Sequence, residues 1–357
     1  MSAVKIELID LEKDWKSQTE LVAKTYSKGK DYILNNRKFF EWFFKNPFVK
    51  GENSFMVIKS KGKIISEMGL VPTRMKFFDK TVDNVNLVNL MALEEFRGKG
   101  TGFFLYKEAE KFGNVCTNTG YGPLVVDFIE NMGWVKMPDL NRFVLVLNGE
   151  KASKLAGKKL EKCKASEKAE TSGMEFVQVE GFGKEAGEFW ERVKEKYPIT
   201  IERSAAYLNW RFSNHPVFDY KMFEVRKEGR VEAVVVLHFE EADGFRVARI
   251  VDFVSGDRAE LFALEKAIEF CKEKDVDLVD FFFSGKFHVG SLGKAGFVEA
   301  KKGAFGSIPM LFSPIDRERK SINFAFKAVN KKLLDERINN FNNWYITKAD
   351  GDQDRPN

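Results

Sequence analysis

Two stretches of the chain repeat one pattern: FFEWFFKNPF at residues 39–48 and YLNWRFSNHPVF at residues 207–218. In both, an aromatic residue is followed at fixed spacings by a tryptophan (Trp42 or Trp210), a phenylalanine and an asparagine, and a proline comes soon afterwards. A motif this specific, written twice, suggests two copies of a longer unit. We expect both tryptophans to pack in the core under the first hairpin of each copy, because repeated aromatic positions more often fix a fold than bind ligands.

Further landmarks follow the two tryptophans in the same order. Each copy continues with strand-like runs around a glycine, another strand, an amphipathic helical stretch, a further strand and a glycine–aromatic pair. The matching landmarks are Gly62 and Gly229, residues 85–93 and 246–254, residues 100–113 and 258–274, and Gly133-Trp134 and Gly296-Phe297. The sequence therefore predicts a tandem duplication. The mixture of elements in each copy predicts an α/β (α+β) fold in which helices flank a mixed central sheet.

The length of 357 residues suits two domains of about 150 residues each. We predict a first domain at residues 1–148, a Lys-rich linker at 149–173, a second domain at 174–315 and a C-terminal part at 316–357. Within that last part, the amphipathic pattern of residues 323–344 predicts a C-terminal helix. The acidic tail after it is either a frayed end or a strap over a binding pocket.

Composition argues against several classes of protein. The net charge of +5 is mild, and the Lys-rich stretch has no interleaved aromatic residues, so we expect no nucleic acid partner. No apolar run is long enough to span a membrane and the N-terminus lacks a secretory layout, so we expect a cytoplasmic protein without a membrane span. Three isolated cysteines and three histidines predict neither a disulfide framework nor a metal site. The oligomeric state is left open.

The chemistry of the first copy is concentrated in Arg97-Gly98-Lys99-Gly100-Thr101-Gly102, between a predicted strand and a predicted helix. Glycines let backbone N–H groups approach a ligand closely, and several unpaired N–H groups converge where a helix begins. Together with the helix dipole and the charges of Arg97 and Lys99, they favour a phosphate group. The spacing matches neither a Walker loop nor a dinucleotide-binding fingerprint.

This stretch resembles the pyrophosphate loop of the GCN5-related N-acyltransferases (GNAT), in which a strand, Arg-x-x-Gly-x-Gly and a helix follow one another. The resemblance extends to Gly133-Trp134 and covers residues 1 to about 148. It implies transfer of an acyl group from acetyl-CoA or a longer acyl-CoA, with a backbone donor near Leu93 stabilising the developing negative charge. The implied cofactor-binding residues are Ala92, Leu93, Arg97, Gly98, Lys99, Gly100, Thr101, Gly102 and Asn118.

The second copy lacks such a loop. At the corresponding place the chain reads VSGDRAEL (residues 254–261), and Asp257 stands where a pyrophosphate would need donors. We therefore expect one acyl-CoA site per chain. The two-unit layout, YLNWRFSNHP and the ending WYITKADGDQDRPN resemble tandem acyltransferases that act on nucleotide-linked amino sugars. This resemblance implies a small-molecule amine acceptor, namely a nucleotide-linked sugar.

The proton-transfer groups are less clear from sequence. Asp252 and His238 each lie in an apolar strand, where a polar side chain must find a partner or costs about 2–7 kcal/mol. We predict that Asp252 or His238 reaches the acceptor amine; the alternative is that both are satisfied core residues. Where the family has a tyrosine to protonate the leaving thiolate, this chain has Ile129. Tyr121 lies nearby in sequence, and solvent or the substrate amine are the other proton sources.

Two other functions remain open. A cell-wall aminoacyltransferase of related two-unit design would use aminoacyl-tRNA. Such an enzyme needs a large basic surface to bind the RNA, whereas the net charge of this chain is only +5. A non-catalytic module would bind an acyl carrier or a partner protein and keep the loop as a relic. The 35 phenylalanines either line a pocket for a long acyl chain or reflect codon usage.

Overall fold

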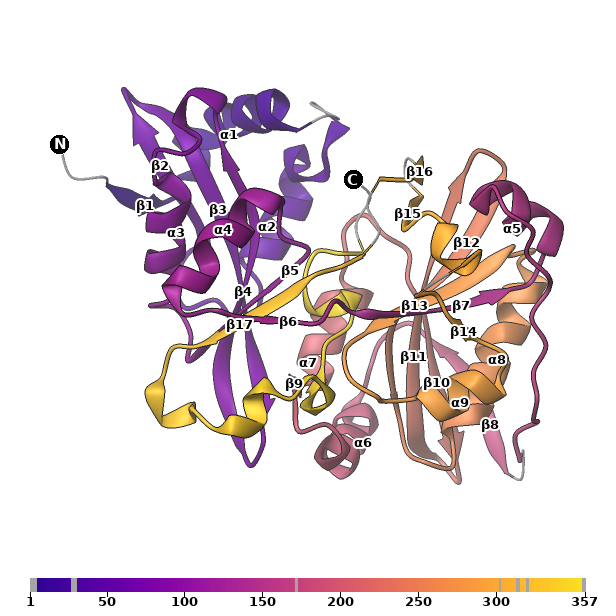
Figure 1. Ribbon diagram of the computed structural model, residues 1–357. Helices are drawn as coiled ribbons and strands as arrows, with labels where there is room; N and C mark the ends of the chain where they lie inside the picture. Colours follow the sequence, from indigo (N-terminus) through magenta and orange to yellow (C-terminus); the bar gives the residue numbers. More distant parts are fainter. Residues whose placement is uncertain are drawn as a thin grey trace.

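The computed structural model describes residues 5–26, 31–170, 173–301, 303–312, 315–318 and 321–354. Two large mixed sheets lie side by side, one in each half of the molecule (Figure 1). The strands of the first sheet, in spatial order, are β1 (Ile6–Leu8), β2 (Phe55–Ser60), β3 (Lys63–Phe77), β4 (Lys80–Ala92), β5 (Val115–Thr119), β17 (Phe324–Ala328) and β6 (Val135–Met137). Those of the second sheet are β8 (Met174–Val179), β10 (Lys221–Lys227), β11 (Arg230–Ala242), β12 (Phe245–Ser255), β13 (Leu278–Phe283), β7 (Asn141–Val146) and β14 (Val298–Glu299).

Short strands and helices complete the two units. The outer half of β3 also pairs with β9 (Ile199–Ile201), which pairs with β18 (Trp344–Tyr345), while β15 (Leu311–Phe312) and β16 (Ile315–Asp316) pair together. The α-helices are α1 (Leu11–Thr25), α2 (Arg37–Phe44), α3 (Thr101–Ala109), α4 (Pro123–Ile129), α5 (Gly149–Ala156), α6 (Lys184–Val193), α7 (Ala205–Leu208), α8 (Glu260–Glu273) and α9 (Val289–Lys294). The short helical turns are η2 (Ile33–Asn35), η3 (Glu94–Phe96), η4 (Glu130–Met132), η5 (Lys194–Lys196), η6 (Asn209–Ser213), η7 (Phe305–Ser307), η8 (Lys331–Leu333), η9 (Glu336–Asn339), η10 (Phe341–Asn343) and η11 (Lys348–Asp350).

The two seven-strand orders match position for position, which agrees with the repeated landmarks in the sequence. The sixth strand of each sheet is exchanged between the halves: β17 follows the second copy in sequence but pairs with β5 and β6, and β7 precedes the second copy but pairs with β13 and β14 (Figure 1). The predicted boundary at residue 148 is therefore misplaced, because β7 belongs to the second sheet. Each half depends on the other for one interior strand.

The predicted C-terminal helix over residues 323–344 is wrong. Its first residues form β17, in which Phe324, Ala325 and Phe326 are fully buried between two neighbouring strands. The remaining residues form the short turns η8 to η10 and lead into β18. Pairing with distant strands overrides the local amphipathic pattern, which a sequence window cannot register.

The predicted Lys-rich linker is partly a helix. Asn148 caps α5 through a hydrogen bond from the Lys151 amide to its side chain, and Ala152 and Leu155 pack onto β7 of the second sheet. The extended residues that follow run along the same unit, where the amide of Ser166 donates to the carbonyl of Lys294. The segment is thus part of the second unit.

The repeated tryptophans lie against each other, not under separate hairpins as predicted. Trp42 of α2 and Trp210 of η6 stack with ring centroids 5.4 Å apart. The indole N–H of Trp42 donates to the backbone carbonyl of Trp210 (2.9 Å), and the indole N–H of Trp210 donates to the carbonyl of Trp42 (3.1 Å). This reciprocal contact is the geometry of a two-fold interface between two related units. The sequence repeats the motif because each copy supplies half of one contact.

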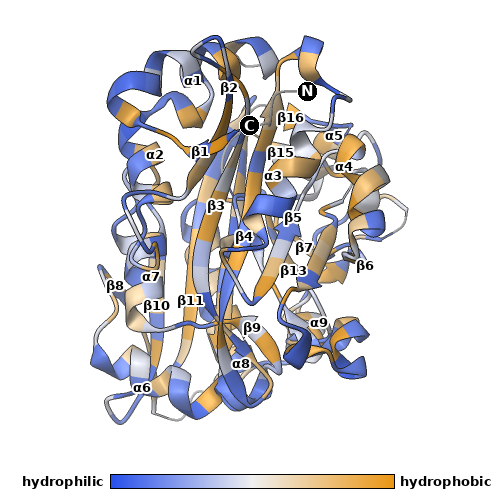
Figure 2. Ribbon diagram, turned by 90° about the vertical axis from the view of Figure 1, so that its left-hand side faces the viewer, coloured by the Kyte–Doolittle hydropathy of each residue, from blue (hydrophilic) through white to orange (hydrophobic). Residues whose placement is uncertain are grey.

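The apolar core is continuous between the units. The largest cluster of buried residues includes Phe40 and Phe44 of α2 as well as Trp190 of α6 and Phe253 of β12. A second cluster lies on the other face of the first sheet, under α3 and α4. Hydrophobic residues follow much of the central strands, whereas hydrophilic residues mark the outer turns (Figure 2).

A buried charge cluster lies between the second sheet and η11. Asp280 pairs with Arg142 (2.7 Å) and Arg249 (3.2 Å), and Arg249 also pairs with Glu240. Lys348 is only 2% exposed, and its ammonium lies 4.6 Å from the centroid of the Phe282 ring. Burial, followed by the charge of Arg249, lowers the pKa of Lys348 to about 7.

Replacing Trp210 by alanine should strongly destabilise the fold. We expect Trp210→Ala to lower the free energy of unfolding by about 3–5 kcal/mol, because a large buried ring and its two-way hydrogen bonding are lost. Leu334→Ala is the control, since Leu334 is 62% exposed and an exposed substitution changes stability by about 0.5 kcal/mol or less. Urea unfolding of the three proteins measures this, and equal losses in both variants would contradict the interface.

Lys348 should make stability depend on pH. Between pH 7 and about 10.4 the unfolded chain holds a proton that the folded protein has released, so stability rises with pH by up to about 1.4 kcal/mol per pH unit. Lys348→Met should lack this contribution, so its stability relative to wild type should fall as the pH rises from about 7 to about 9. Urea titrations at both pH values test this; a constant difference would mean that Lys348 stays charged.

Candidate functional site

The strands β4 and β5 separate part-way along the first sheet. They pair in parallel from Asn84–Val115 to Asn86–Thr117, and β4 then continues alone on that side as far as Ala92. On its other side, the register with β3 shifts between Glu67 and Gly69, so that two residues of β4 lie opposite one residue of β3. One of these two, Asn89, has a left-handed φ of 54°. A bulge of this kind bends a strand locally and redirects its side chains.

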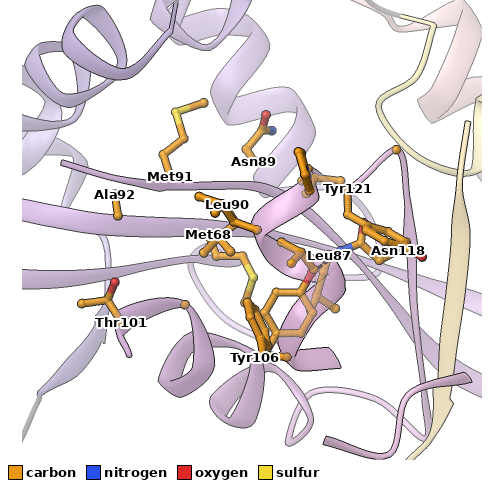
Figure 3. Close-up of a pocket in the computed structure, with 18 of the residues that line it drawn as sticks. Met68, Leu87, Asn89, Leu90, Met91, Ala92, Thr101, Tyr106, Asn118 and Tyr121 are labelled. Atoms are coloured by element: carbon orange, nitrogen blue, oxygen red, sulfur yellow. Dashed lines mark hydrogen bonds between the residues drawn. The ribbon is translucent and has the colours of Figure 1, made fainter. Parts of the chain in front are cut away.

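A cavity of about 980 Å³ lies at this separation and has lining residues from both faces of the sheet. Met68, Leu87, Leu90, Tyr106 and Phe128 line it on the α3–α4 side. Thr25, Tyr26 and Met91 line it on the opposite side, where α1 ends, and Asp352 and Gln353 of the C-terminal segment complete the wall. Figure 3 shows Asn89 and Met91 on one side of β4 and Met68 and Tyr106 on the other. The cavity thus passes between the separated strands.

The glycine loop forms the mouth of this cavity on the α3–α4 side. Gly98 and Gly100 have left-handed φ values of 72° and 82°, which only glycine adopts without strain. No side chain caps α3, so the N–H groups of its first turn donate no hydrogen bond to a capping residue. Gly102 lies so close to β4 that a Cβ atom there would approach Leu90 to 3.2 Å. The backbone therefore presents an uncapped helix N-terminus to the cavity, which suits a phosphate group.

Most of the predicted cofactor residues meet in this place. Those that line the cavity are Ala92, Arg97, Gly98, Gly100, Thr101, Gly102 and Asn118. Leu93 and Lys99 are not part of the lining. The exposed Lys99 ammonium lies over the Phe96 ring, 5.4 Å from its centroid. The exposed Arg97 side chain folds back, and its Nε donates to the carbonyl of Ala92 (3.2 Å).

Of the two predicted residues at the end of β4, Ala92 and not Leu93 has an N–H group that is free of the β3–β4 ladder. The Leu93 N–H donates to the carbonyl of Ile65 on β3 (3.0 Å), so it is not available to a ligand. Ala92 lies opposite Ser66 in the same antiparallel ladder. Because N–H directions alternate along such a ladder, the Ala92 N–H points away from β3, toward the separated edge.

Two tyrosines line the cavity on the α3–α4 side. The Tyr106 hydroxyl accepts a hydrogen bond from the Asn118 side chain. The Tyr121 hydroxyl has no hydrogen-bond partner in the described part of the chain, and burial, with the nearby carboxylate of Asp139, raises its pKa to about 12. Ile129, the last residue of α4, is fully buried in the apolar cluster between this helix and the first sheet. Tyr121 therefore keeps its proton at neutral pH. The sequence did not indicate Tyr106 as a cavity residue, because a tyrosine on an amphipathic helix carries no motif.

The predicted amine-binding residues lie elsewhere. The Asp252 carboxylate is 1% exposed and binds the guanidinium of Arg203 (3.0 Å) and the hydroxyl of Thr347 (3.2 Å). His238 is buried against the Phe218 ring, 4.8 Å away between centroids, and its burial lowers its pKa. Neither residue lines the cavity. The structure therefore places both in the core of the second unit. Asp252 is satisfied there, as the alternative expected, whereas His238 Nδ1 has no hydrogen-bond partner in the described part of the chain.

The C-terminal segment is a buried strap, not a frayed end, throughout its described part. Arg203 binds Asp350 (2.8 Å), and Arg211 binds Asp354 and donates to the carbonyl of Ala349 (2.9 Å). Asp350 and Asp354 are 6% and 3% exposed. Two buried ion pairs thus fix the segment that carries Asp352 and Gln353 to the cavity.

The same segment occupies the corresponding separation in the second sheet. β12 and β13 pair in parallel only as far as Ile250–Phe281. Beyond this point, the Tyr345 hydroxyl donates to the carbonyl of Phe253, and Ser284 and Ile346 exchange hydrogen bonds. The turn before α8 carries Asp257, and the first residue of α8 is Glu260, whose carboxylate contacts His288. The second unit therefore has acidic groups at its helix start and its own chain in the gap.

No group of histidine, cysteine, aspartate or glutamate side chains in the described ranges could hold a metal ion. None of the described helices is long and apolar enough to cross a membrane.

Comparison with known proteins shows the fold. No protein-family model matches the chain, and no curated protein matches it in sequence. A GCN5-related N-acetyltransferase from Anabaena variabilis ATCC 29413 matches with a TM-score of 0.58 and 9% identity, over 92% of this chain and 73% of that chain. Saccharomyces cerevisiae N-myristoyltransferase with bound myristoyl-CoA matches with 0.55 and 12%, over 92% and 83%.

A conserved protein from Enterococcus faecalis V583, described as a probable N-acyltransferase, matches with a TM-score of 0.62 and 12% identity, over 93% of this chain and 74% of that chain. Each match extends over both halves of this chain. At these identities the likeness concerns the fold alone. The chain shares its two GNAT-like units, each a mixed sheet with flanking helices, with these three structures.

Proposed function

We propose that the chain is an acyl-CoA-dependent N-acyltransferase that moves an acyl group to a primary amine, with a nucleotide-linked amino sugar as the acceptor. The observation that carries this proposal is the uncapped, glycine-bounded start of α3 at the mouth of a cavity that passes between β4 and β5. The resemblance of the tandem layout and the C-terminal ending to amino-sugar acyltransferases supports the choice of acceptor.

The residues of the first unit fit coenzyme A. The N–H groups at the start of α3 and the guanidinium of Arg97 would hold the diphosphate, since an uncapped helix N-terminus favours anions. Met68, Leu87, Leu90 and Phe128 form an apolar wall further inside. When bound, acyl-CoA supplies an acyl thioester. The acidic start of α8 and the occupied gap disfavour a second such site.

Two groups of the chain suit the chemistry of acyl transfer. The Ala92 N–H, directed to the open edge of β4, would stabilise negative charge that develops on the acyl oxygen. The Tyr121 hydroxyl would donate its proton to the leaving sulfur, because its pKa of about 12 keeps it protonated. The amine would enter from the opposite face, where Thr25, Tyr26 and the C-terminal segment line the cavity.

Coenzyme A should stabilise the protein through the first unit. At one hundred times its Kd we expect stabilisation by about 2.7 kcal/mol, measured by thermal unfolding. Arg97→Ala should weaken binding about 10-fold or more through loss of a charged contact. Arg258→Ala is the matched control, because Arg258 is an exposed arginine at the corresponding place of the second unit. Absence of any shift in wild type would contradict the proposal.

The reaction itself is tested by mass spectrometry of mixtures of acyl-CoAs with nucleotide-linked amino sugars. The proposal expects an amide product with acyl-CoA consumed in equal amount. Binding without any product would indicate a non-catalytic module, and product formed only from aminoacyl-tRNA would indicate the cell-wall type of aminoacyltransferase.

Removing the Tyr121 hydroxyl should slow the chemical step. Tyr121→Phe should lower kcat by about 100-fold, the lower range for loss of a general acid, while the affinity for coenzyme A stays unchanged. An acyl thioester of a more acidic thiol should recover much of the rate, because its leaving group needs no proton. An equal rate loss with both thioesters would show that Tyr121 does not act as the acid.

A further inference from the structure

Three buried polar atoms in the wall of the cavity have no hydrogen-bond partner in the described part of the chain. They are Asn89 Nδ2, Thr119 Oγ1 and Asn323 Oδ1, and all three residues line the cavity. A buried polar group left unpaired costs about 1–3 kcal/mol, so three together at one site point to a polar ligand that pairs with them.

The neighbours of these residues fix what each one offers. The Tyr32 hydroxyl donates to Asn89 Oδ1 (3.1 Å), which leaves the Asn89 amide N–H as a free donor. Asn323 Nδ2 donates to the carbonyl of Tyr121 (2.9 Å), which leaves Asn323 Oδ1 as an acceptor. The hydroxyl of Thr119 can do either. The wall therefore presents a donor from β4, a hydroxyl from β5 and an acceptor from the residue before β17.

The C-terminal strap lies directly against this wall. A Cβ atom at Gly351 would lie 2.6 Å from Thr119 Oγ1, so only glycine permits this approach. The side chain of Gln353 donates to the carbonyl of Thr119 (3.1 Å) and to Asp352 Oδ1 (2.6 Å). Asp352, which is 5% exposed, brings a carboxylate to the same part of the cavity.

We infer that Asp352, Asn89, Thr119 and Asn323 form the acceptor subsite, and that it takes a compact primary amine with hydroxyl groups on neighbouring carbons. The carboxylate would hold the ammonium through a charge-assisted hydrogen bond. A hydroxyl can donate to Asn323 Oδ1 and accept from Asn89 Nδ2, as an apolar amine cannot. A site built in this way rejects analogues that leave its polar atoms unpaired. The inference rests on the proposed function for the identity of the reaction only.

Calorimetry with three probes tests the subsite without coenzyme A. D-glucosamine has both the amine and the hydroxyl groups, cyclohexylamine has only the amine, and D-glucose has only the hydroxyls. We expect glucosamine to bind at least about 10-fold more tightly than either of the others. Glucose lacks the charged hydrogen bond of the ammonium group, and cyclohexylamine lacks the neutral hydrogen bonds of the hydroxyl groups.

Variants assign the preference to single residues. Asp352→Asn should remove the preference for glucosamine over glucose, and Thr119→Ala should reduce the preference for glucosamine over cyclohexylamine. Asp335→Asn is the control and should change neither preference, because Asp335 is the half-exposed cap before η9 and does not line the cavity. Coenzyme A should stabilise all of these variants to the same extent as wild type.

Several results would overturn the inference: no binding of glucosamine, equal binding of glucosamine and cyclohexylamine, or an unchanged preference in Asp352→Asn. Tighter binding of a tripeptide amine than of glucosamine would replace the hydroxyl-bearing acceptor by a peptide. Failure of coenzyme A to stabilise wild type would instead contradict the proposed function, and the calorimetry would still decide the subsite.

Discussion

The buried guanidinium groups of Arg203 and Arg211 hold the C-terminal segment inside the protein, and the arrangement of both units depends on this. Arg203 lies between Asp252 of the second sheet and Asp350 of the segment, and Arg211 binds Asp354. Removing one partner from a buried ion pair leaves an uncompensated charge and is strongly destabilising, by about 3–5 kcal/mol. The acidic segment is therefore a structural element, as far as Asp354, and not a solvated tail.

This single segment makes the two copies unequal. In the second unit it fills the separation between β12 and β13, where Tyr345 and Thr347 bond to Phe253 and Asp252. In the first unit the corresponding separation between β4 and β5 remains a cavity, and the segment only lines its far wall. The duplication thus provides one open cleft, one closed cleft and a connector that joins them. The reciprocal contact of the tryptophans holds the two units together. The exchanged strands β7 and β17 also fix the position of one unit relative to the other.

Local patterns in the sequence were sufficient for the repeated unit and for the glycine loop, because the φ values of Gly98 and Gly100 and the start of α3 are local properties. Features that depend on distant partners were not predictable. The residues of β17 have an amphipathic pattern but acquire strand partners about two hundred positions away. Asp252 was predicted to be functional because its partner Arg203 could not be identified from sequence. Asp352 was not singled out, because an acidic ending is typical of a frayed terminus.

The central claim is that coenzyme A enters the first cleft and is excluded from the second. Hydrogen–deuterium exchange with and without saturating coenzyme A tests this most directly, because it reports on both clefts in one experiment. The account predicts slower amide exchange at the end of β4, in the glycine loop and at the start of α3, with no change at the end of β12 or the start of α8. Protection at β12 and α8, or at neither place, would contradict it.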